Sequence, residues 1–141
     1  MRLNPDESFH LELFRNFSHA RCKGADIAEV LEAAGQLKGT DMESFYQAFI
    51  VLAERVDRQA QAIDGKRHPV SAHDAFFQAS THSRAADFYL HGKPDDLRIS
   101  TLWESKQMYM IRQLLYCLFQ GECCSRRQRW LISNSNHLYP C

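Results

Sequence analysis

The sequence predicts an all-α protein of about five helices followed by an irregular C-terminal tail. Three observations lead to this prediction. Apolar residues recur three or four positions apart along five segments, which is the spacing of one helical face. Polar residues suited to cap a helix stand at the start of four of these segments. No segment alternates between apolar and polar residues convincingly enough to predict a β-strand.

The first two predicted helices are short. Residues 7–18 carry an apolar face formed by Phe9, Leu13 and Phe17. The second helix begins at Asp26, because Glu29 follows three residues later and this pair can cap a first helical turn. A glycine ends it, either Gly35 or Gly39. Its apolar face consists of Ile27, Val30, Leu31 and Ala34.

The third predicted helix is long and amphipathic. It begins at Thr40, which forms the same kind of capping pair with Glu43. An apolar stripe follows, made of Phe45, Phe49, Leu52, Val56 and Ile63. The helix stops at Asp64, because the glycine that follows it tolerates the left-handed conformation of a helix end.

Two further helices follow the extended dipeptide at 68–69. The fourth is predicted to begin at Ser71, capped with Asp74, and to continue to Leu90 before a His-Gly pair ends it. After a turn at 93–96, the capping pair of Thr101 and Glu104 predicts the start of a fifth helix that runs to residue 119. We expect the turn's two aspartates to accept hydrogen bonds from backbone amides, not to act as an acid and a base.

A change in composition near residue 113 divides the chain. Residues 1–113 carry 16 acidic and 14 basic residues and form the predicted helical domain. Residues 114–141 hold the end of the last helix and a Cys- and Arg-rich tail, which we expect to be poorly ordered. Three arginines beside Trp130 suggest a nucleic-acid patch, but a short solvated segment is the better interpretation because three charges neutralise few phosphates.

Charge and hydropathy argue against several classes of partner. Seventeen basic and seventeen acidic residues cancel, so no overall field attracts the chain to nucleic acid. The mostly apolar run 108–119 is shorter than the roughly 20 residues that span a bilayer. The N-terminal segment is interrupted by charges, unlike a signal peptide. We therefore expect a cytoplasmic protein that binds neither nucleic acid nor membrane.

The motifs of common catalytic and cofactor sites are missing from the sequence. It contains no G-x-S-x-G elbow for a serine nucleophile, no phosphate-binding loop and no dinucleotide turn. His73 and His82 fall on opposite sides of a helix, so they cannot share a metal ion. The five cysteines lack the paired spacing of a zinc site and are expected to be free thiols. No catalytic residue, metal site or cofactor is predicted.

Aromatic residues of the fourth helix offer one candidate ligand pocket. Phe76, Phe77, Phe88 and Tyr89 could line it together with Arg84. Aromatic residues at helical spacing more often belong to a core, and that is the favoured alternative.

Four segments resemble a known family. They are ESFHLEL at 7–13, GADIAEVLEAA at 24–34, ESFYQAFIVLAERVDRQA at 43–60 and HPVSAHDAFFQASTHSRAADFYLHGKPDD at 68–96. They are similar to the N-terminal helical segment of α/β-hydrolases that include fungal polyketide-shortening hydrolases of pigment biosynthesis and, more distantly, the bacterial 2,6-dihydropseudooxynicotine hydrolase. The resemblance covers roughly residues 5–112, and its most specific part is the run at 68–96.

The resemblance implies a helical cap that covers the active site of a serine hydrolase and shapes a pocket for a polyketide-like substrate with a C–C or ester bond. The pocket-lining candidates become Phe76, Phe77, His82 and Arg84; relatives tend to have aromatic residues where this chain has residues 81–83. The catalytic triad of such relatives follows the helical segment. No position of this sequence matches it, because the chain departs from the family pattern near residue 113.

Two functions are compatible with these observations. The chain is a truncated hydrolase, present as its cap and inactive alone, which meets its small-molecule substrate only when joined to a catalytic domain. Alternatively, it is a small helical interaction protein that self-associates or pairs with a hydrolase domain through an uncovered apolar face. Whether the tail reflects a true truncation or an error in the gene model stays open.

Overall fold

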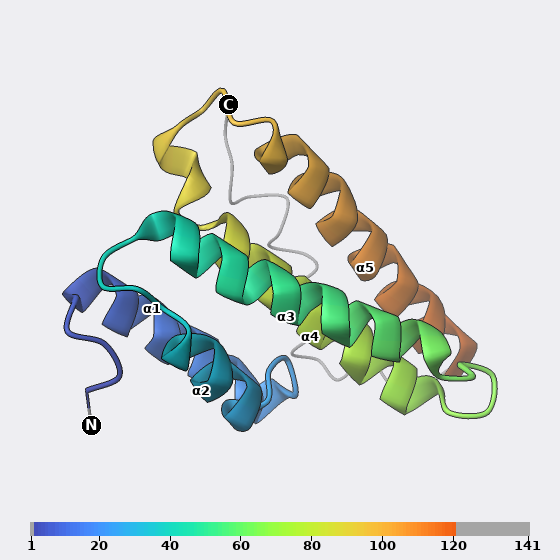
Figure 1. The fold of residues 1–141 in the computed structure, drawn as a ribbon. Coiled ribbons are helices and arrows are strands. Elements are labelled where there is room, and N and C mark those ends of the chain that lie inside the picture. Colours follow the sequence, from blue (N-terminus) through green and yellow to red (C-terminus); the bar gives the residue numbers. More distant parts are fainter. Residues whose placement is uncertain (1, 121–141) are drawn as a thin grey trace.

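The computed structural model describes the backbone of residues 2–120 and the side chains of residues 2–112 (Figure 1). The α-helices are α1 (Glu7–Ser18), α2 (Ile27–Gly35), α3 (Met42–Ala62), α4 (Pro69–Asp87) and α5 (Arg98–Gln120). Short 3-10 helices, η1 (His19–Cys22) and η2 (Leu90–Gly92), follow α1 and α4. Residues 2–120 contain no strand, so the all-α prediction of about five helices is confirmed.

The fourth helix is the centre of the arrangement. It contacts both α3 and α5 extensively and also contacts α1. Figure 1 shows α3, α4 and α5 as three long helices, with the shorter α1 and α2 at the lower left of the view. None of the helices within the described part is both long enough and apolar enough to cross a lipid bilayer.

Side-chain caps explain where the first three helices begin. Asp6 accepts a hydrogen bond from the Phe9 amide at 2.9 Å, and Asp26 accepts one from the Ala28 amide at 2.8 Å. The second of these caps was predicted from the sequence. At α3 the prediction is wrong by one residue: Asp41, not Thr40, accepts from a first-turn amide. A carboxylate at this position satisfies a free N–H that the helix itself leaves unpaired.

The predicted starts of α4 and α5 are also wrong. The fourth helix begins at Pro69, two residues before Ser71, because proline needs no amide partner in a first turn and its fixed φ suits a helix. It ends at Asp87, and Leu90 belongs to η2. The fifth helix begins at Arg98, three residues before Thr101, where the Asp96 side chain accepts from the Arg98 amide at 3.0 Å.

Most of the predicted apolar stripe of α3 lies in the core. Four of its members are buried: Phe45, Phe49, Leu52 and Val56. Ile63 follows the last turn and is half-buried. On α2 the predicted face is rotated, because Val30 and Ala33 are buried whereas Ile27 and Leu31 are exposed. A helix of two to three turns makes few contacts, so its apolar pattern only loosely specifies the buried side.

Aromatic rings join α1, α3 and the end of α4. The ring of Phe9 lies 5.0 Å from both Phe45 and Tyr89, measured between centroids, and Phe45 stacks on Phe49 at 4.8 Å. Edge-on and stacked ring pairs add about 0.5–1.5 kcal/mol beyond the burial of their area. Tyr89, a candidate pocket residue in the sequence, is therefore part of the core packing.

Candidate functional site

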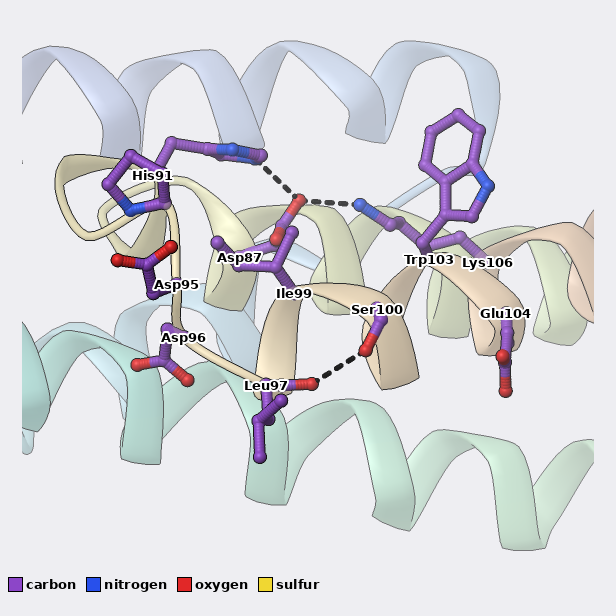
Figure 2. Close-up of a pocket in the computed structure, with 11 residues that line it drawn as sticks. Asp87, His91, Asp95, Asp96, Leu97, Ile99, Ser100, Trp103, Glu104 and Lys106 are labelled. Carbon is purple, nitrogen blue, oxygen red and sulfur yellow. Dashed lines mark hydrogen bonds and ion pairs between the residues drawn. The ribbon is translucent and has the colours of Figure 1, made fainter.

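A hollow of about 720 Å³ opens between the end of α4 and the first turns of α5 (Figure 2). This volume lies within the roughly 300–1,000 Å³ of common small-molecule sites. The loop between the two helices contributes Pro94, Asp95 and Asp96 to its lining. The lining residues are Asp87, His91, Pro94, Asp95, Asp96, Leu97, Ile99, Ser100, Trp103, Glu104 and Lys106.

A buried carboxylate joins the two helices at this hollow. The Asp87 side chain is only 6% exposed, and its Oδ2 accepts a hydrogen bond from the Lys106 ammonium of α5. The same oxygen lies 3.1 Å from Nε2 of His91, as Figure 2 shows. The other oxygen, Oδ1, is buried and has no donor among the described residues. Burying a charged group is costly unless an opposite charge lies beside it, and the Lys106 ammonium is that group for the Asp87 carboxylate.

The loop of the hollow is fixed by an arginine. The Arg98 guanidinium donates to both carboxylate oxygens of Asp96, from Nε to Oδ1 at 2.9 Å and from Nη2 to Oδ2 at 2.7 Å. Its NH1 also lies 2.9 Å from each carboxylate oxygen of Glu43 on α3. The hydrogen bonds from Arg98 lower the pKa of Asp96 to about 2. These contacts tie the start of α5 to α3. The predicted backbone contact is confirmed for Asp96, which accepts from the Arg98 amide, but no such contact is found for Asp95 among the described residues.

Apolar side chains form the outer part of the hollow. Trp103 is 51% exposed and Leu97 is 84% exposed, although both are large hydrophobic residues. The Lys106 ammonium lies 5.6 Å from the centroid of the Trp103 ring, within range of a cation–π contact. The hollow thus combines a flat apolar surface with a charged hydrogen-bonding group.

The hollow has the features of a binding site but not those of a nucleophilic active site. Ser100, its hydroxyl-bearing residue, donates to the backbone oxygen of Leu97 at 2.8 Å. Across residues 2–112, no hydrogen bond connects a Ser, Thr or Cys side chain to a histidine ring, as an activated nucleophile requires. The same residues include no group of three potential metal ligands.

The four pocket-lining candidates of the sequence lie elsewhere on α4, and the structure does not gather them around this hollow. Phe76 is buried beneath the Arg112 guanidinium of α5, which lies 5.1 Å from its ring. Phe77 contacts Gly24, where an added Cβ would come within 2.9 Å of the ring. These two neighbouring rings therefore face different parts of the molecule.

The other two candidates are polar residues, one fully buried and one partly buried. His82 is fully buried, with its ring 6.3 Å from Phe49 and its Nε2 3.8 Å from Oε2 of Glu29. Arg84 donates to Oε1 of Glu12 at 3.2 Å, and burial lowers its pKa while Glu12 opposes that shift. A pocket-lining role for the four residues stays a prediction.

The sequence reasoning missed the residues that the structure does bring together. Asp87 and His91 are four positions apart, a spacing that places two side chains on one helical face. This spacing is the one local signal for the pair, whereas the sequence by itself predicts that His91 belongs to a helix end. Lys106 lies 19 positions after Asp87, and no local pattern connects them.

The comparisons with known proteins connect the chain with fungal hydrolases. It is 31% identical over 101 residues to the hydrolase acrC of Aspergillus aculeatus, covering 72% of this chain and 24% of that protein. It is 34% identical over 86 residues to the alpha/beta hydrolase psoB of Aspergillus fumigatus, covering 61% of this chain and 19% of that protein. The 20-hydroxy-prefusarin hydrolase of Gibberella moniliformis is 33% identical over 91 residues, covering 64% of this chain and 22% of that protein.

These similarities confirm the resemblance predicted from the sequence. The chain spans about a quarter or less of the length of these relatives. No protein-family model and no solved structure matches it.

Proposed function

We propose that the helical segment 1–113 covers the active site of an α/β hydrolase and orients its substrate, while the nucleophile, acid and histidine come from a catalytic domain. The substrate would be a polyketide-like compound with a C–C or ester bond. Alone, the chain would not catalyse hydrolysis, because a covering segment contributes desolvation and orientation but no activated nucleophile.

One observation carries the proposal. The similarity to hydrolases falls on a helical chain that contains no G-x-S-x-G elbow. Its described residues also lack a hydroxyl or thiol hydrogen-bonded to a histidine. The hydrolase relatives are several times longer, so most of their sequence has no counterpart in this chain.

A chimera tests the covering role. In the Aspergillus aculeatus hydrolase, the segment that aligns with this chain would be replaced by the corresponding residues of this chain. We expect a folded protein that still hydrolyses an aryl ester, with an altered ranking of acyl groups. A folded chimera whose ranking equals that of the parent enzyme would contradict the proposal.

The expected inactivity of the chain alone needs a separate measurement. Purified chain is incubated with a fluorophosphonate probe and its intact mass is measured, in parallel with an aryl ester assay. We expect neither an adduct nor turnover above buffer. A stoichiometric adduct would mean that the chain holds a reactive serine and is more than a covering segment.

The exposed face of α5 favours one alternative, an interaction module. Trp103, Met108, Met110 and Ile111 are each 44–52% exposed. Grouped exposed apolar side chains often mark a protein contact. If the chain is a self-associating module, sedimentation will show a defined dimer, and Ile111→Glu will convert it to a monomer. A monomeric wild-type chain would count against this alternative.

A further inference from the structure

We propose that the hollow between α4 and α5 binds a neutral aromatic carbonyl compound, with Trp103 contacting its ring and Lys106 donating to its carbonyl oxygen. The inference rests on the proposed function, because it takes this hollow as the place where the covering segment holds the substrate. It assigns ligand recognition to Trp103 and Lys106. Neither is among the four pocket-lining candidates predicted from the sequence.

The ring contact follows from the position of Trp103. Its indole is half-exposed at the hollow, and the apolar side chains of Leu97 and Ile99 line the same space. A flat ring placed there would remove apolar area from water on both partners. Aromatic rings also gain from offset stacking on an indole, which an aliphatic ligand of equal area does not.

The carbonyl contact follows from the unused hydrogen-bonding capacity of Lys106. Its side chain is only 17% exposed, so water has limited access to the ammonium. A lysine ammonium has three N–H donors. Within the described residues, the hydrogen bond of Lys106 goes to Asp87, which leaves donors for an acceptor in the hollow. A carbonyl oxygen accepts without adding charge.

The unpaired oxygen of Asp87 is an independent sign that this site lacks a partner. Oδ1 belongs to a carboxylate that is more than nine-tenths buried and that lines the hollow. Buried polar atoms normally have a hydrogen-bond partner, and each exception requires an explanation.

The charges around the hollow disfavour an anionic ligand, and the contact with Lys106 disfavours a positive charge at the carbonyl position. Asp87 pairs with Lys106, and Asp96 shares the Arg98 guanidinium with Glu43. The two other acidic residues that line the hollow are Asp95 and Glu104, and neither has an ion-pair partner in the described part of the chain. An anionic ligand would be repelled by these two carboxylates, whereas a cationic ligand would be repelled by Lys106 at the carbonyl position.

A ligand series on the full-length chain tests these contacts. The probes share one ring system: 2-acetonaphthone is the neutral ketone, 2-ethylnaphthalene lacks the acceptor, 2-naphthoate is anionic and 2-naphthylmethylamine is cationic. Binding is followed by the Trp103 indole N–H resonance, assigned with Trp130→Phe. We expect saturable binding of the ketone and about tenfold weaker binding of the hydrocarbon, the usual effect of one hydrogen bond to a charged donor.

Two variants on α5 distinguish a specific contact from non-specific hydrophobic binding. Trp103→Ala should raise the Kd of the ketone about tenfold, through the loss of ring stacking and burial. Met110→Ala is the matched control, because Met110 is an exposed apolar residue of the same helix outside the hollow. It should leave the Kd unchanged within about twofold.

Several results would overturn the inference. They are an unshifted Trp103 resonance, equal affinities for the ketone and the hydrocarbon, tightest binding by the naphthoate or the amine, and equal effects of the two variants. The ketone and hydrocarbon comparison uses the wild-type chain, so it tests Lys106 even if variants at that position do not fold. If the chimera shows an altered ranking of acyl groups but the chain does not bind the ketone, only this inference is refuted. If the chain binds the ketone but the chimera ranks acyl groups as the parent enzyme does, the covering role is refuted.

Discussion

The helices α3 and α4 lie side by side, yet they bury different kinds of side chain. The buried residues of α3 are all apolar: Phe45, Ala48, Phe49, Leu52, Ala53, Val56 and Ala60. Half of those in α4 are polar or charged: His73, Thr81, His82, Ser83 and Asp87, beside five apolar residues. The two helices are of similar length, so the difference comes from their surroundings.

The number of packing partners accounts for the difference. The face of α3 opposite its core side carries exposed residues such as Val51 and Glu54, so a single stripe suffices. Because α4 contacts α1, α3 and α5, nearly every side of it is covered, including positions with polar side chains. Those side chains then need partners on neighbouring helices, such as Glu12 for Arg84 and Lys106 for Asp87. Substitutions on the two helices test this contrast.

The largest effect is expected in the apolar core of α3. Phe49 is fully buried and stacks on Phe45, so Phe49→Ala should lower the free energy of unfolding by about 4 kcal/mol through lost burial and a cavity. Urea unfolding measures this change. Val51→Ala, at an exposed position of the same helix, should change stability by less than about 0.5 kcal/mol. Similar losses of unfolding free energy at both positions would contradict the conclusion that α3 buries only one of its faces.

The next effect is expected at the ion pair between α4 and α5. Lys106→Met leaves the buried carboxylate of Asp87 without its ammonium and should cost about 3 kcal/mol in unfolding free energy. The double variant Asp87→Leu with Lys106→Met should regain most of that loss, because it removes both charges. If the double variant is as unstable as the single one, packing and not the charge explains the cost.

A smaller effect of opposite sign is expected at His82. Both ring nitrogens are buried without a hydrogen-bond partner among the described residues. Replacing the ring by an apolar side chain removes unsatisfied polar atoms, so His82→Leu should raise the free energy of unfolding by about 1 kcal/mol. A loss of stability in thermal unfolding would instead show that the histidine has a partner.

A comparably small effect is expected at the start of α3, with a control one residue away. Asp41→Ala removes the side-chain cap and should cost about 1 kcal/mol, whereas Thr40→Ala should cost almost nothing. Chemical unfolding of both variants measures the difference. Equal costs would support Thr40 as a second cap.

The smallest effect concerns the solvent-exposed turn before α5 and depends on pH. The pKa of Asp96 is about 2 in the folded protein, below its ordinary value near 3.8. Its interaction with Arg98 therefore stabilises the fold fully above pH 4 and is lost as the pH falls toward 2. The advantage of the wild type over Asp96→Asn in urea midpoint should shrink between pH 5 and pH 2.5. A constant advantage would contradict the link to this carboxylate.

The sequence alone determined the helical class, the stripe of α3 and the resemblance to hydrolases. These depend on residues three or four positions apart, or on the order of residues in one segment, both of which can be read locally. The sequence also located the Asp26 cap and the structural role of Asp96. It misplaced three helix starts: at α3 and α5 a nearby aspartate accepts from the first-turn amide, and α4 begins at Pro69 without a side-chain cap.

Only the tertiary structure decided which polar residues meet. Arg84 and Glu12 are 72 positions apart, and Asp87 and Lys106 are 19 apart. No periodic pattern connects such pairs, because their contact depends on how the helices pack. The hollow beside Trp103 exists for the same reason: its walls come from the end of one helix, a loop and the start of another. The position of α4 between its neighbours is what turns these separate residues into one candidate site.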